Sequence, residues 1–333
     1  MLKYLAAEQQ EKRTSPITYQ SFSHQRLMHN DTLLIAHTEE LWAAINLFFA
    51  HFASSDWGRP HGKDWNFGDV PYHLKYFHIL AADAIKHGRE AAQDELVEVR
   101  TLSELAAFNK SRFAERPHNQ TGAQSFNLFK RSQEILRDAI KASGDGTTPN
   151  LDRQVWFPLM RARGWHSTRF VLEYMYWHNW LHFSEAQLRL TNELPPIDAD
   201  MMHRAVHFHM HEIAGAVDQR HAPQRLVWLH RLTGDGGGAW TYVIDKGWAK
   251  VADGEPADGR CDVLVEHGID TYLKTMAFGM LSPLRAALTG QTHLKGARTV
   301  AKLARIFSPP EDQQWQPMQD IEAEDTSEQE RSA

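Results

Sequence analysis

The sequence predicts two folded parts of different class, an all-α helical bundle over residues 31–192 and an α+β domain with a mainly antiparallel sheet over residues 200–308. In the first part, apolar residues recur at steps of three and four, which is the period of an α-helix. After the proline-containing run TNELPPIDAD, which we interpret as a linker, the period falls towards two and glycine-rich turns separate short apolar runs. A chain of 333 residues is long enough for two such domains.

Charge separates a near-neutral body from an acidic end. The net charge is -6, and residues 310–333 hold eight acidic residues against the single Arg331, which leaves about +1 for the rest. The first 30 residues form a polar lead-in, and we expect residues 310–333 to be a disordered acidic tail, with partner binding as the alternative. A near-neutral body predicts no nucleic-acid partner. One cysteine excludes a disulfide framework.

Five stretches of the first part have helical periodicity. The first begins at Asp31 or Thr32, either of which can cap it, and a loop rich in Gly, Pro and Ser follows. Asp69 and Pro71 suit the first turn of the second helix, where a carboxylate favours the helix dipole and proline loses no hydrogen bond. The expected helices cover residues 31–53, 66–88, 102–116, 124–143 and 170–190.

The second part reads as strands joined by turns. Expected strands cover residues 206–212, 225–232, 239–245, 249–253, 261–268 and 292–296, with helices at 269–281 and 297–307. On the first strand, His207, His209 and His211 would share one face. They form a second metal patch, or they lie on a polar face or at the domain interface.

The longest helix contains a candidate metal-binding pair. His178 and His182 lie four residues apart, so both imidazoles leave one helical face, and Glu185 follows on the same stripe. Two imidazoles can bind one divalent ion if a third ligand comes from elsewhere. The alternative is chance, because 20 histidines give such spacing without function. Glu185 could be a catalytic residue, acting as a general base or orienting a ligand imidazole. The alternative is that it is an exposed acid on the helix surface.

The residues from Trp65 to Val70, WNFGDV, followed by His73, resemble the second-helix signature of the DinB/YfiT-like metalloprotein superfamily. The pair His178 and His182 resembles its second ligand pair, and FNKSRFAER is similar to the mycothiol-dependent maleylpyruvate isomerase branch. That branch has Glu where this chain has His178. The resemblance implies a metal held by His73, His178 and His182, with zinc the best fit and nickel, iron or manganese as alternatives.

Residues 280–307, MLSPLRAALTGQTHLKGARTVAKLARIF, are similar to the end of sterol-carrier-protein-like domains. The segment VHFHMHE also resembles the first strand of the carboxy-terminal domain in maleylpyruvate isomerase-like proteins. This resemblance implies a tunnel for a lipid or acyl ligand in the second domain. The alternative is a closed core.

Together the resemblances imply a metal-dependent enzyme that uses a low-molecular-weight thiol, as an S-transferase or a maleylpyruvate isomerase-like enzyme, on a small electrophilic substrate. The alternatives are a lipid- or acyl-binding carrier with the helical domain as scaffold, and a metal-stabilised interaction protein. The longest apolar run, LWAAINLFFAHFA, is too short to span a bilayer and no signal peptide is evident, so we expect a cytoplasmic protein without a transmembrane segment. A homodimer is compatible with the resemblance.

Overall fold

The computed structural model describes residues 30–62, 64–88, 99–221, 225–296, 303, 305–315 and 318. Its α-helices are α2 (Asp31–Ala50), α3 (Asp69–His87), α4 (Leu102–Ala114), α5 (Gly122–Ala142), α6 (Thr168–Thr191), α7 (Ala199–Ile213), α8 (Ile269–Tyr272) and α9 (Pro283–Leu288). Its strands are β1 (Pro60–His61), β2 (Trp65–Asn66), β3 (Gln154–Phe157), β4 (Gly164–Ser167), β5 (Leu226–Thr233), β6 (Gly238–Asp245), β7 (Trp248–Asp253), β8 (Val263–Gly268) and β9 (Thr292–Lys295).

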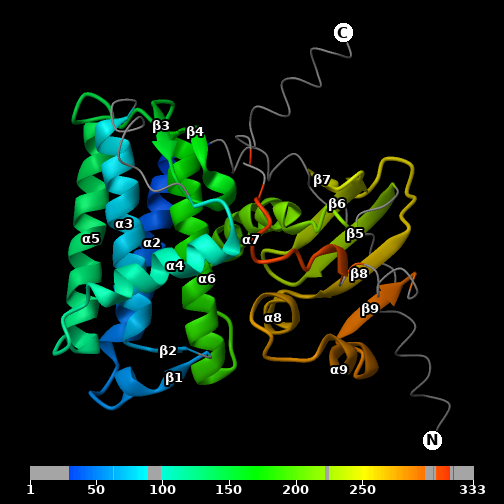
Figure 1. The fold of residues 1–333 in the computed structure, drawn as a ribbon, viewed down its shortest axis with the longest axis horizontal. Coiled ribbons are helices and arrows are strands. Elements are labelled where there is room, and N and C mark those ends of the chain that lie inside the picture. Colours follow the sequence, from blue (N-terminus) through cyan, green and yellow to red (C-terminus); the bar gives the residue numbers. More distant parts are fainter. Residues whose placement is uncertain are drawn as a thin grey trace, which may run out of the picture. The chain divides into compact units, whose positions relative to one another are not determined.

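Helices α2, α3, α5 and α6 run alongside one another as a bundle, with α4 crossing it (Figure 1). The five helices expected from the sequence are present, each within three residues of its expected bounds. Local chemistry sets several of these ends: Thr101 and Thr121 each form a capping box with the residue three positions later, and Ser167 accepts a hydrogen bond from the backbone of Phe170.

Two short hairpins interrupt the bundle, so the expectation of a purely α-helical first part was wrong there. Strand β1 pairs with β2, and β3 pairs with β4, both antiparallel. Strands of two and four residues are too short to show a period of two in the sequence. The β1–β2 hairpin matters for the site because it fixes Trp65 opposite His61.

The second part contains a five-stranded sheet in the order β7-β6-β5-β8-β9. Strand β5 pairs with β6, β6 with β7 and β8 with β9 in antiparallel fashion, whereas β5 and β8 are parallel. The sheet is therefore mixed, and the prediction of a mainly antiparallel sheet holds for three of its four pairs. The helix expected at 269–281 is shorter in the structure. It consists of α8 followed by a single π turn, Leu273–Ala277.

The predicted strand at 206–212 is wrong, because these residues belong to helix α7. Asp198 caps this helix by accepting a hydrogen bond from the backbone of Met201. Tyr176 on α6 donates to the carbonyl of Met201, and Tyr242 on β6 donates to the carbonyl of Met210. All residues of α7 from Met201 to Glu212 are buried. The letters V-H-F-H-M-H alternate between apolar and polar residues and so imitate the period of a strand within a segment that folds as a helix.

Several predictions are not tested. The lead-in at 1–30 lies outside the described residues except for Asn30, as do most of the helix at 297–307 and of the tail at 310–333. The boundaries of the two folded domains, 31–192 and 200–308, also stay predictions.

By length and composition, α2 is the one described helix that could cross a membrane. Its Leu34, Leu41 and Ile45 are fully buried in the bundle core, and the core helix of a soluble protein passes the same test.

Candidate metal centre

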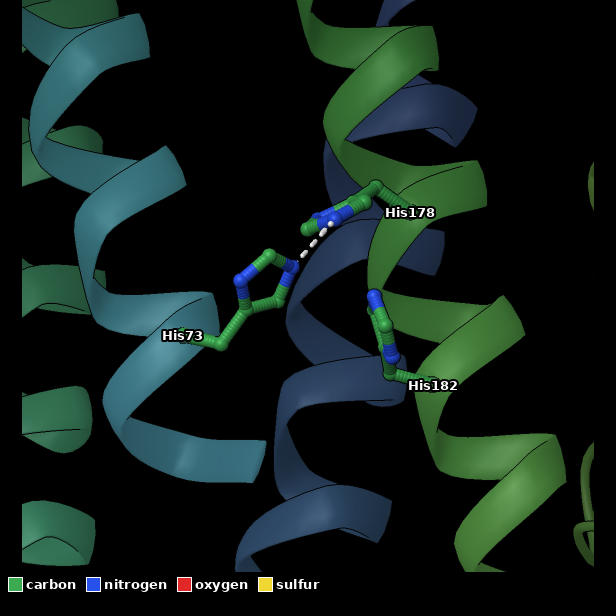
Figure 2. Close-up of side chains that lie close together, drawn as sticks. All are labelled: His73, His178 and His182. Atoms are coloured by element: carbon green, nitrogen blue, oxygen red, sulfur yellow. Dashed lines mark hydrogen bonds between the residues drawn. The ribbon is translucent and has the colours of Figure 1, made fainter. Parts of the chain in front are cut away.

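Three histidines from two helices converge in the bundle. His73 comes from the second turn of α3, and His178 and His182 come from successive turns of α6. Figure 2 shows the three rings directed into the same space between these helices. The Nε2 atoms of His73 and His178 lie 3.1 Å apart, and one nitrogen from each of the three rings lies within 4.8 Å of the others. The structure thus brings together the three histidines that the sequence selected.

The surroundings of the three rings favour their neutral form. Burial lowers the pKa of His73 and His178 well below the usual value, and the neighbouring histidines lower it further. Burial also lowers the pKa of His182 to about 4, although the Glu185 carboxylate opposes this. A neutral imidazole has a free lone pair at pH 7, which is the form that binds a metal ion.

The donor set fits a divalent transition-metal ion. Two nitrogens bound tetrahedrally to zinc at about 2.0–2.1 Å are separated by roughly 3.3 Å, close to the 3.1 Å between His73 and His178. Among the described atoms, Nδ1 of His178 and Nδ1 of His182 are buried without a hydrogen-bond partner. On His178 the nitrogen nearest His73 is Nε2, so an ion held there would leave Nδ1 of that ring to an outer hydrogen-bond partner.

Aromatic rings fix the orientation of the imidazoles. Phe77 stacks on His178 with ring centroids 4.1 Å apart, and Trp65 stacks on His182 at 5.8 Å. Trp65 also contacts His73 at 4.7 Å, so one indole touches two of the three histidines. These rings exclude water from one side of the cluster and limit the rotamers open to the histidines.

The turn before α3 places Trp65 and His73 in register. The backbone N–H of Asn66 donates to Asp69 at 2.7 Å, and the N–H of Gly68 donates to the side chain of Asn66 at 2.9 Å. Asp69 also forms an ion pair with Arg116, which follows α4. The acid expected in the first turn of this helix therefore ties the tryptophan-bearing hairpin and the end of α4 to the start of α3.

Glu185 lies near the cluster but does not belong to it. Its Oε1 accepts hydrogen bonds from Arg189, with Nη2 at 2.7 Å, and its Oε2 lies 3.9 Å from Nε2 of His61. His61 is buried, and the sequence analysis did not select it. No signal marks it in the sequence, since it lies on a two-residue strand and pairs with no other histidine by spacing.

A small hollow with about 170 Å³ of empty space opens beside His73. Its other lining residues come from α3 and α4 and are Tyr76, Phe108, Asn109, Arg112 and Phe113. Most of this space is open to solvent and none of it is enclosed enough to hold a water molecule, so the lining side chains would have to move apart to admit a ligand.

The histidines of α7 separate onto two faces, contrary to the single face expected of a strand. His209 accepts a hydrogen bond at Nδ1 from the indole of Trp177 on α6, at 2.9 Å. His207 and His211, four residues apart, both face Asp253 at the end of β7.

Comparison with known proteins gives partial similarities. No protein-family model matches the sequence. Hydroxysteroid dehydrogenase-like protein 2 of Pongo abelii is 32% identical to this chain over 83 residues, which are 25% of this chain and 19% of that protein. The chain therefore spans about a fifth of the length of this relative.

Among solved structures, the mycothiol-dependent maleylpyruvate isomerase and a mutant of it are each 12% identical to this chain, with TM-scores of 0.45 and 0.47. Each match covers 75% of this chain and 87% of the other. The sec-alkylsulfatase Pisa1 from Pseudomonas sp. is 17% identical, with a TM-score of 0.25 over 68% of this chain and 32% of the other. Identities this low leave function to be inferred from the site itself.

Proposed function

We propose that the protein is a metal-dependent enzyme that uses a low-molecular-weight thiol to transform a small electrophilic substrate, as an S-transferase or an isomerase. One observation supports the metal most directly: three histidines, two of them buried and His182 half-buried, direct nitrogens to within 4.8 Å of one another beside a hollow. The thiol and the electrophile come from the sequence resemblance to the mycothiol-dependent isomerase branch.

His73, His178 and His182 would hold the ion, which leaves a coordination position for a non-protein ligand, as in catalytic zinc sites. A bound divalent cation lowers the pKa of a coordinated thiol, so that a nucleophilic thiolate exists at neutral pH. Zinc suits three imidazoles best, and nickel, iron and manganese are the alternatives.

Glu185 stays the candidate catalytic residue, and we add His61 as its partner. The Oε2 of Glu185 and the Nε2 of His61 lie 3.9 Å apart, a distance that a bridging water or a small side-chain movement can close. Arg189 holds the other carboxylate oxygen and so orients the group. In this proposal the pair takes up the proton that the thiol loses, at Oε2 of Glu185 or Nε2 of His61.

The hollow beside His73 would bind one end of the substrate once its lining side chains move apart. Arg112 and Asn109 supply polar groups to its lining, and Phe108 and Phe113 supply apolar rings. A guanidinium beside an aromatic wall suits an electrophile that carries a carboxylate.

One observation favours a second candidate function, a lipid or acyl carrier. Around α9, the apolar side chains of Leu284, Leu288 and Met276 are 69%, 79% and 51% exposed. Exposed apolar residues this close together are typical of a surface that binds an apolar ligand. Solvent extraction of the purified protein followed by mass spectrometry tests this candidate, which predicts a co-purified lipid.

Metal analysis by mass spectrometry on untagged protein tests the metal centre. We expect the His73→Ala and His182→Ala variants each to contain one equivalent of metal less than wild type. The matched control is His87→Ala, which removes an exposed histidine from the last turn of α3 and should leave the metal content unchanged.

Protein purified without chelator that neither contains metal nor takes up zinc would overturn the proposal. If metal is present, incubation with a panel of thiols and electrophilic carboxylic acids tests the enzyme. Wild type but not His182→Ala should consume the electrophile, and the thiol should be consumed with it by a transferase and recovered unchanged from an isomerase. Inactivity across the panel with a full metal site would favour the carrier.

A further inference from the structure

A second group of metal-ligating side chains lies away from the bundle histidines, between α7 and strand β7. His207 and His211 leave the same face of α7, one turn apart, with ring centroids separated by 4.6 Å. Asp253 is the last residue of β7, which forms one edge of the five-stranded sheet. A helix and a strand edge that are distant in sequence thus present two imidazoles and one carboxylate to each other.

The distances match a shared ion. Nδ1 of His207 lies 3.3 Å from Oδ1 of Asp253, and Nε2 of His211 lies 3.5 Å from the same oxygen. One donor atom from each of the three residues lies within 4.8 Å of the others. Ligand atoms about 2.0–2.2 Å from a tetrahedral zinc ion are separated by roughly 3.3–3.5 Å.

Without an ion, one protonated imidazole and a hydrogen bond from the other, neutral ring would satisfy the Asp253 carboxylate. Two imidazolium rings 4.6 Å apart would repel each other, so only one ring would carry a proton in that arrangement. Both histidines are buried, so a second charged ring would also lose its hydration. A divalent cation satisfies both neutral rings and the carboxylate at once.

The surroundings leave the group free to take a cation. The nearest other charges form pairs of their own, Glu173 with Arg204 and Glu212 with Arg161. With both rings neutral, the three-residue group carries one negative charge, that of Asp253. The Asp253 side chain is 53% exposed, which gives an ion access from solvent and leaves room for a water ligand.

We propose that His207, His211 and Asp253 form a second divalent metal site, distinct from the three-histidine site in the bundle. Two imidazoles and one carboxylate favour a borderline transition-metal ion such as zinc over calcium or magnesium, which prefer all-oxygen ligands. The ion would fasten the sheet edge to α7. Because it binds only the folded state, it would raise the stability of the protein with increasing free metal concentration.

Zinc titration of chelator-stripped full-length protein by isothermal calorimetry tests the proposal. The variants are Asp253→Asn, which keeps the shape of a half-exposed side chain, and His211→Gln. Asp235→Asn is the matched control, since it removes an exposed acid from the turn between β5 and β6. A His182→Ala background separates the two sites.

We expect two zinc ions per wild-type chain, one in Asp253→Asn, one in His182→Ala and none in the double variant, with Asp235→Asn unchanged. Loss of one of the three ligands should lower the zinc affinity of the second site by at least about 100-fold. Loss of a residue that only hydrogen-bonds to a ligand lowers metal affinity by up to about 100-fold, and loss of a ligand itself should cost at least as much. If the bundle site does not bind metal, wild type and His182→Ala should both bind one ion, and Asp253→Asn should bind none. Equal zinc binding by wild type, Asp253→Asn and His211→Gln would overturn the proposal.

A second measurement covers the case in which a variant does not fold, as judged by circular dichroism. X-ray absorption on zinc-loaded His182→Ala protein reports the ligands of the remaining ion. Two imidazoles with oxygen ligands are expected, and a shell without imidazole, or an absence of zinc, would contradict the second site.

Discussion

Arg204 on α7 forms a fully buried ion pair whose disruption should strongly destabilise the protein. Its side chain is 0% exposed, its Nη1 donates to Oε1 of Glu173 on α6, and its Nε donates to Nδ1 of His37 on α2 at 3.3 Å. In Arg204→Met, the carboxylate of Glu173 stays buried without this cation. Removing one partner of a buried pair typically lowers the free energy of unfolding by about 3–5 kcal/mol. We expect a loss in that range.

A double-mutant cycle tests the reason for this loss. Glu173→Met should cost a similar amount, because it leaves the guanidinium buried without its carboxylate. The double variant places two unbranched apolar side chains in the same volume, which is often close to neutral for stability. We therefore expect the double variant to be more stable than either single variant, with a coupling free energy of at least about 3 kcal/mol.

Urea unfolding at pH 7.5, followed by tryptophan fluorescence and by circular dichroism, measures these free energies. Arg131→Met, which removes an exposed arginine from α5, is the control and should change the free energy of unfolding by less than about 0.5 kcal/mol. Single variants within about 1 kcal/mol of wild type, or a double variant at the sum of the two losses, would refute the reasoning.

Two further predictions concern packing and pH. In Gly122→Ala the added Cβ would lie 2.6 Å from Trp57, so the free energy of unfolding should fall by about 1–3 kcal/mol in urea. Gly58→Ala, where a Cβ meets nothing within 4 Å, is its control and equal losses would contradict the packing argument. Burial lowers the pKa of His78 to about 3, against about 6.5 when unfolded, so its contribution to stability is complete above pH 6.5 and is lost as the pH falls towards 3. Between pH 4.5 and 7.5, the free energy of unfolding should therefore change less steeply with pH in His78→Gln than in wild type. The two slopes should differ by up to about 1.4 kcal/mol per pH unit. Equal slopes would exclude His78 as the cause.

The helical bundle could be predicted because each of its helices leaves one face to solvent or ends at a recognisable signal. The periodicity of α5, and the acid and proline in the first turn of α3, show this clearly. The pair His178 and His182 was visible for the same reason, since helical spacing is local. His73 is 105 residues from His178 in sequence, and only a motif around Trp65 indicated that it would join the pair.

The parts that could not be predicted depend on distant neighbours. Helix α7 is covered by α6 on one side and by the sheet on the other, so its histidines are buried among apolar residues and the sequence imitates the alternation of a strand. Asp253 joins His207 only because the edge strand β7 lies beside that helix, and His61 faces Glu185 only through a two-residue hairpin. Neither contact has a signature in the spacing of the residues.

The double burial of α7 also determines where this chain can be divided. A fragment that ends in the polar run after residue 192 would expose the face of α6 that includes Tyr176 and Trp177, whose partners on α7 are Met201, Phe208 and His209. A fragment that begins there would leave α7 with one apolar side uncovered. Chimeras and truncations for expression should therefore keep α6 and α7 in the same polypeptide, even though the sequence marks the segment between them as a natural place to cut.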